Sequence, residues 1–267
     1  MNWNLVRKTI SDRWRGTAIY AGALAAYVLM LTAMFPSFQK MTGVKEMLEN
    51  YPESMSRFFG VESIDITSFN NFMAMELLGL MFVIIVGAFV FSFARYMVAG
   101  ELRDGTLELL LAQPIQRWKM LTSKGAVLLA GIVGIVLATV LSVFAFGAAF
   151  GIDVSHAGFL AYAPVAIALF VAIAGYSILF STALYRPRWV VMASVGVTLG
   201  FYMMNFAATS SQSLEKLGYF TIFHYYNPLK VLDSGSVPVG DVLVLLGIGA
   251  ACFAASIYFF QRKDIAS

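Results

Sequence analysis

The chain has 267 residues, of which 60% are hydrophobic and only 12% are charged, and its net charge is +3. A soluble domain carries about 25% charged residues, so this composition excludes an ordinary soluble protein and indicates an integral membrane protein. Cys252 is the only cysteine, which excludes an intramolecular disulfide and a metal site built from cysteines of this chain.

The first predicted element is an amphipathic helix over residues 1–16. Trp3, Val6, Ile10 and Trp14 recur at helical spacing, and basic residues occupy the other faces. Tryptophan at the level of the lipid headgroups, with Arg and Lys beside it, is typical of a helix that lies on the membrane surface. We therefore expect a cytoplasmic interfacial helix here, and the alternative is a simple basic flank of the first span.

Six apolar runs along the chain are long enough to cross roughly 30 Å of hydrocarbon as helices. They predict an all-α, polytopic fold in which residues 1–267 form a single membrane domain. The predicted spans are 17–35, 77–94, 125–150, 157–184, 189–208 and 242–260.

The connecting segments predict which side of the membrane each loop occupies. Of the 18 Lys and Arg residues, 13 lie at the two termini and in the second and fourth loops. The positive-inside rule therefore places both termini and these loops in the cytoplasm. Two longer segments are then external: residues 36–76, with periodic apolar residues that Pro52 divides into two short helices, and residues 209–240, with room for one short helix.

The loop over residues 99–124 has the densest set of charges. Projected as one helix at about 100° per residue, Glu101, Asp104 and Glu108 share a face with the small residues Gly105 and Ala112. A low-relief face that carries carboxylates suits close contact with a basic surface of another protein. From spacing alone, a solvated loop helix with ordinary charges is equally open.

The same loop resembles that of a known family. Its order of residues is similar to the loop after the second span in type-2 ABC transporter permeases, in particular the small six-span permeases that are separate from their ATPase. The matching residues run Glu101…Gly105-Thr106-Leu107-Glu108-Leu-Leu-Leu-Ala-Gln-Pro114-Ile-Gln-Arg117-Trp…Lys124. The segment Pro52-Glu53…Phe58-Phe59-Gly60 also resembles this subgroup, so the resemblance covers roughly residues 1–130.

The resemblance implies a half-transporter, in which two permease chains, identical or related, form the pathway of an exporter. It also implies two copies of an ABC ATP-binding subunit at the cytoplasmic face, with the loop helix over residues 101–113 as the coupling helix. Carried over to this sequence, the residues that couple to the ATPase are Glu101, Asp104, Gly105, Thr106, Leu107, Glu108, Pro114 and Arg117.

The energy source is expected on a partner. The sequence has no Gly-x4-Gly-Lys-[Ser/Thr] motif for nucleotide phosphates, so ATP and Mg²⁺ are expected on the ATP-binding subunit and no cofactor on this chain. No convergent acid, base or metal ligand is visible, so we predict no catalytic residue and no metal site. The basic residues follow membrane topology, which argues against nucleic-acid binding.

The remaining polar residues leave the cargo open. Asn205 and Gln212, in or near the fifth span, would either line a pathway or bond a neighbouring helix. Because no predicted span has a charge at its centre, an ion-coupled carrier is disfavoured and a hydrophobic or amphipathic cargo, such as a lipid, drug or peptide antibiotic, is expected. We expect a bacterial plasma (inner) membrane. The alternative function is a non-transporting scaffold or sensor that recruits a cytosolic ATPase.

Overall fold

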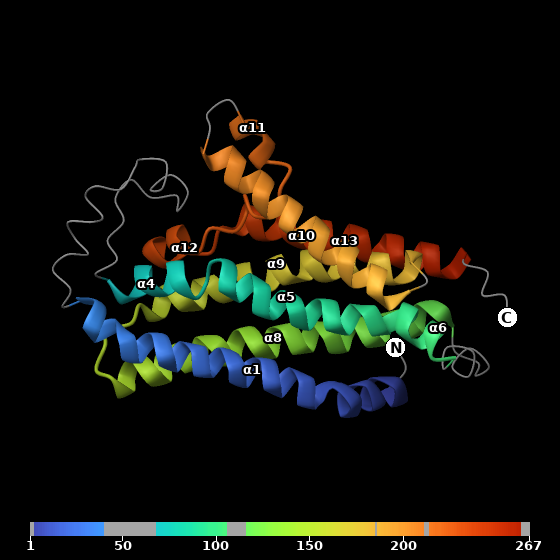
Figure 1. The fold of residues 1–267 in the computed structure, drawn as a ribbon, viewed down its shortest axis with the longest axis horizontal. Helices are drawn as coiled ribbons and strands as arrows, with labels where there is room; N and C mark the ends of the chain where they lie inside the picture. The colour runs from blue at the N-terminus through green and yellow to red at the C-terminus, as the bar shows by residue number, and fades with distance from the viewer. Residues whose placement is uncertain (1–2, 40–67, 106–115, 185, 211–213, 263–267) are drawn as a thin grey trace.

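The computed structural model describes residues 3–39, 68–105, 116–184, 186–210 and 214–262, and no strand is present within these ranges. Figure 1 shows a bundle of long helices with shorter helices at its ends. In chain order the elements are α1 (Trp3–Gln39), α4 (Phe69–Glu76), α5 (Leu80–Arg95), the π-helix η1 (Tyr96–Gly100), α6 (Glu101–Arg103), α8 (Arg117–Ala149), α9 (His156–Ala183), α10 (Pro187–Ser210), α11 (Glu215–Gly218), α12 (Pro228–Ser234) and α13 (Val239–Arg262).

Six of the described helices are long and apolar enough to cross a membrane, which confirms the all-α fold and the six predicted spans. The second span differs most at its start. α5 begins at Leu80 rather than at residue 77, because α4 precedes it and a short turn separates the two helices. The hydroxyl of Ser68 starts α4 by accepting a hydrogen bond from the amide of Asn71, at 3.2 Å. Of the predicted external segment 36–76, residues 36–39 belong to α1 and residues 69–76 form α4, and residues 40–67 lie outside the described residues.

The prediction of a separate interfacial helix at residues 1–16 is wrong in one respect. Residues 3–16 are helical, but they are continuous with the first span, and α1 has 37 residues and a length of about 55 Å. Leu5 and Val6 are buried in the bundle, whereas Trp3 and Trp14 are exposed. Packing against the protein therefore fixes this part of α1, which the alternation of apolar and basic residues does not reveal.

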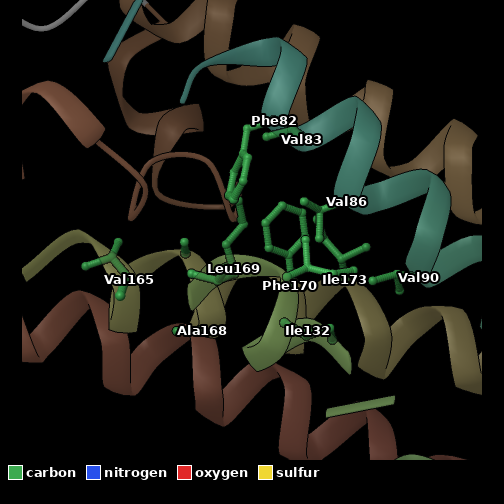
Figure 2. Close-up of a cluster of buried hydrophobic side chains, with 14 of the residues drawn as sticks. Phe82, Val83, Val86, Val90, Ile132, Val165, Ala168, Leu169, Phe170 and Ile173 are labelled. Atoms are coloured by element: carbon green, nitrogen blue, oxygen red, sulfur yellow. The ribbon is translucent and has the colours of Figure 1, made fainter. Parts of the chain in front are cut away.

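α9 is the central helix of the fold. Within its most apolar window 72% of the residues are buried, compared with 17% in α10 and in α13. Figure 2 shows side chains of α5 packed on those of α9, including Phe82 against Phe170, with ring centroids 5.5 Å apart. Lipid tails are as apolar as these side chains, so close packing rather than removal from water stabilises the contact.

α9 and α13 approach each other closely at two glycines. A Cβ atom on Gly175 would lie 2.6 Å from the carbonyl oxygen of Gly249, which is a backbone atom and cannot move aside. Small residues at such a crossing let helix backbones come into contact in a membrane. A polar link ties α9 to α10 as well, where the hydroxyl of Tyr176 donates to that of Thr198.

The two ends of the bundle differ in what surrounds them. The start of α1, the end of α13 and α6 lie at one end, here called the termini end, whereas α4 and α12 lie at the opposite end (Figure 1). At the opposite end the Tyr226 hydroxyl donates to the Leu78 carbonyl and accepts from the Tyr162 hydroxyl, both at 2.6 Å. Burial raises the pKa of Tyr226, so its hydroxyl remains a donor at neutral pH.

The segment over residues 209–240 contains two short helices, α11 and α12, where the sequence predicted room for one. Asn227 starts α12 by accepting a hydrogen bond from the amide of Lys230 at 3.1 Å, and Pro228 occupies the first helical position. α12 packs against α4 and α9, which closes the opposite end of the bundle.

Candidate functional site

The second span does not end as a regular α-helix. α5 passes at Arg95 into the π-helix η1, and α6 continues the chain for one further turn. Met97, Val98, Ala99 and Gly100 are buried. A π-helical turn is rare and occurs often at functional sites, so this widened segment at the termini end marks the place to examine.

A buried ion pair joins η1 and α6 to α8. The ammonium of Lys124 contacts the carboxylate of Glu101, and it donates a hydrogen bond to the carbonyl oxygen of Met97 at 3.0 Å. Lys124 is only 5% exposed. It is therefore a partner of the second span.

Ser181 of α9 holds the next two backbone groups of η1. Its hydroxyl oxygen accepts hydrogen bonds from the amides of Val98 and Ala99, at 3.3 and 3.4 Å. Three successive residues of η1 thus have a backbone group bound by a side chain of another helix. Sequence analysis missed Ser181, because a serine inside an apolar helix carries no local sign of what it will contact.

α1 contacts the same segment through the ring of Tyr96. The guanidinium of Arg13 lies 4.5 Å from the ring centroid, and that of Arg95 lies 4.6 Å from it. Gly100 makes room for this ring, since a Cβ atom there would lie 2.6 Å from it. A cavity of about 250 Å³ lies beside these groups and is lined by residues of α1, α5, η1, α6 and α8. We call η1 with Arg13, Glu101, Lys124 and Ser181 the η1 junction.

The helix that leaves the η1 junction is short. α6 ends at Arg103, Asp104 is its C-cap, and Gly105 has a φ of +70°, in the left-handed region that ends helices. The projection of residues 101–112 as one continuous helix is therefore wrong at Gly105. Glu101 and Asp104 are also separated, because Glu101 turns inward to Lys124 while Asp104 is exposed and pairs with Arg103 at 2.8 Å.

The structure places the other predicted coupling residues as follows. Arg117 is the first residue of α8, and its Nη1 atom donates to the carbonyl of Phe260 on α13 at 3.2 Å. This contact links the start of α8 to the last turn of α13. Residues 99–103 and 117–124 of the predicted loop are helical and continue the two spans. Thr106, Leu107, Glu108 and Pro114 lie outside the described residues.

The two candidate pathway residues have different outcomes. The amide oxygen of Asn205 accepts a hydrogen bond from the hydroxyl of Thr221, 3.2 Å away, which favours the reading that Asn205 bonds a neighbouring segment. The Thr221 hydroxyl shares its one proton between Asn205 and the carbonyl of Gly218, and its oxygen accepts from the amide of His224, so Asn205 belongs to a local network at the end of α10. Gln212 lies outside the described residues.

The burial of Lys124 does have a signal in the sequence. Met120 and Leu121 precede it by four and three residues, and Val127 and Leu128 follow it by three and four. All four are buried, so Lys124 is on the inward face of α8. Helical periodicity would thus have placed Lys124 inside the bundle, although it would not have named Glu101 as the partner.

Comparison with protein families decides the class of the chain. The family described as ABC-2 family transporter protein matches residues 3–265. The chain belongs to this family. The match confirms the resemblance seen in the loop and extends it from roughly residues 1–130 to all six spans. None of the curated proteins compared with the chain matches it.

Membership fixes the role of the chain at a general level. An ABC-2 protein of this kind is the membrane permease component of an ABC transporter, a multi-pass subunit that is not itself catalytic and works with an ABC ATPase. The η1 junction and the loop after it lie between the second and third spans of this permease. It is the described region where buried charges, a π-helix and the start of the predicted coupling segment come together.

Proposed function

We propose that this chain is the permease half of an ATP-driven exporter, that two such chains or one and a related chain form the pathway, and that each binds an ATP-binding subunit through the loop after α6. The observation that carries the proposal is the family match over residues 3–265, which includes this loop and all six spans. The start of α1 and the end of α13 lie at the same end as α6, which agrees with the topology that the basic residues predict (Figure 1).

The geometry supports the loop as the contact and changes which residues serve it. Asp104 and Gly105 come directly after α6, outside the bundle, with the Asp104 side chain exposed. Glu101 faces Lys124, so its part in coupling is to hold the loop rather than to contact the ATPase. Thr106, Leu107 and Glu108 follow Gly105 in the chain and remain the proposed contact, with Pro114 at the end of the coupling segment and Arg117 fixing the start of α8.

A lateral groove supports a hydrophobic or amphipathic cargo. It has a volume of about 400 Å³ and lies between α8, α9 and α13, within the apolar part of these spans. Small residues form much of its wall, including Gly125, Ala174, Gly175 and Ala250. An apolar recess open to the side of a bundle suits molecules that reach the protein from the bilayer rather than hydrated ions.

The test uses the permease reconstituted in lipid vesicles with an ABC ATP-binding subunit from the same cell. The change is Asp104→Arg, which reverses an exposed charge beside the proposed contact without entering the bundle. We expect loss of ATPase binding and of the permease-dependent part of ATP hydrolysis, because a partner surface that accepts a carboxylate repels a guanidinium. The matched control is Asp233→Arg, the same change at an exposed residue of α12 at the opposite end.

Two results would count against the proposal. If Asp104→Arg and Asp233→Arg gave the same binding and the same ATP hydrolysis as the unaltered chain, the loop after α6 would not be the contact. If the assembled complex hydrolysed ATP but moved neither a fluorescent phospholipid nor an amphipathic dye across vesicles, the chain would act as a scaffold or sensor that recruits an ATPase.

A further inference from the structure

At the η1 junction, side chains of two other helices bind successive backbone groups of η1. The Met97 carbonyl receives the Lys124 ammonium, and the Val98 and Ala99 amides both donate to the Ser181 hydroxyl. These partners come from α8 and α9, which are far apart from η1 in sequence. A π-turn departs from the regular hydrogen-bonding pattern of an α-helix, and here side chains of other helices supply additional hydrogen bonds to its backbone groups.

We propose that η1 is a hinge that is held closed by Ser181 and the Glu101–Lys124 pair. These positioning residues make η1 move together with α9 and α8, so that a displacement of the chain after α6 is passed to the spans rather than absorbed in η1. This inference rests on the proposed function, since it names the residues that connect the proposed ATPase-binding loop to the spans. A displacement of the loop would reach α9, the most buried span, through Ser181, and α8 through Lys124.

The surroundings of η1 allow such a displacement. The cavity of about 250 Å³ lies on the α1 side of η1, so the segment is bound by α8 and α9 but has space toward α1. Tyr96 contacts α1 through the guanidinium of Arg13, an arrangement in which the ring can slide without breaking a directional hydrogen bond. The η1 junction is thus held firmly to α8 and α9 and only loosely to α1, so η1 can open toward α1 when its attachments to α8 and α9 are lost.

Two consequences follow for coupling. With both attachments present, the loop and the spans behave as one body, so closure of the ATP-binding subunits moves α8 and α9. Without Ser181, the amides of Val98 and Ala99 lose a shared acceptor and η1 opens more often, so closure of the ATPase is absorbed in η1. ATP hydrolysis then continues while transport falls.

The experiment compares Ser181→Ala with Ser177→Ala, one turn away on α9. Both serines are fully buried, but the Ser177 hydroxyl donates to the carbonyl of Ile173 within α9, whereas the Ser181 hydroxyl accepts from η1. The first readout is hydrogen–deuterium exchange of the Val98 and Ala99 amides in the permease alone in lipid nanodiscs. The second is the ratio of cargo transported to ATP hydrolysed by the complex.

We expect Ser181→Ala to exchange about five-fold faster at Val98 and Ala99, as loss of one net hydrogen bond predicts. We also expect its transport-to-hydrolysis ratio to fall, with ATPase binding unchanged and Ser177→Ala like the unaltered chain in both readouts. A general loss of packing would lower ATPase binding and thermal stability in both variants, so it is distinguishable from loss of the hinge contact.

The inference is overturned if Ser181→Ala and Ser177→Ala show equal exchange at Val98 and Ala99, or equal transport per ATP, in a complex whose unaltered form transports. A different result defeats the proposed function instead. In that case the unaltered permease neither binds nor stimulates the ATP-binding subunit, and the comparison of variants in the complex does not arise. Failure of the inference is therefore measured on the variants, and failure of the proposed function on the unaltered permease.

Discussion

The two ends of this bundle are stabilised by different chemistry. At the opposite end, Tyr162, Tyr226 and the Leu78 carbonyl form a chain of neutral hydrogen bonds among buried groups. At the termini end, Lys124 and Glu101 form a buried ion pair beside a cavity. Neutral bonds add stability at a small desolvation cost, whereas a buried ion pair contributes little net stability and fixes which groups face each other. This contrast agrees with the proposal that the termini end transmits movement and the opposite end does not.

The largest effect is expected at the termini end. Lys124→Met removes the cation and leaves the Glu101 carboxylate in a poorly solvated place, which should cost about 3 kcal/mol. We expect a clearly lower midpoint of thermal unfolding for the permease in detergent. Lys119→Met, five residues earlier on the same helix and near the ring of Trp118, is the control and should change the midpoint little.

A second variant isolates the charge itself. Lys124→Met combined with Glu101→Gln removes both charges, and we expect it to regain most of the unfolding midpoint, because no unpaired ion remains. If the double variant unfolds as early as Lys124→Met alone, the ion pair is not what Lys124 contributes, and the contrast between the two ends would have to rest on the bond from Lys124 to Met97.

The opposite end should show a smaller loss. Tyr226→Phe removes the hydroxyl that links Tyr162 to the Leu78 carbonyl, which we expect to cost about 1 kcal/mol. The transport-to-hydrolysis ratio should stay unchanged, since this end is held together but does not transmit movement. The control is Tyr225→Phe, whose hydroxyl donates to the Tyr219 carbonyl in an exposed position. A fall in the ratio for Tyr226→Phe with stable protein would contradict the comparison.

The smallest effect belongs to the exposed pair of the loop. Arg103 and Asp104 contact each other at 2.8 Å but remain largely exposed, with side-chain exposures of 58% and 45%. Water screens such a pair, so Arg103→Gln should leave the unfolding midpoint unchanged. A measurable destabilisation would show that charges on the surface of the termini end act as the buried pair does.

The sequence located the segment after the second span correctly but predicted the wrong arrangement of its side chains. The charges between two apolar runs pointed to residues 101–117, and the family match agrees with that resemblance. The same reasoning joined Glu101, Asp104 and Glu108 on one face, because a projection assumes a continuous helix. Gly105 ends the helix, and Lys124 draws Glu101 inward. The assignment of sides by the positive-inside rule stays a prediction.

By itself the sequence determined the helical class, the six spans and the family, because span length, apolar content and the order of residues in one loop are properties of contiguous stretches. It did not determine that the amphipathic start of α1 is continuous with the first span, or that η1 is a π-helix. Nor did it determine that Ser181 and Lys124 bind η1. Those features were decided by which helices lie side by side, since a buried polar group is stable only where packing brings it a partner.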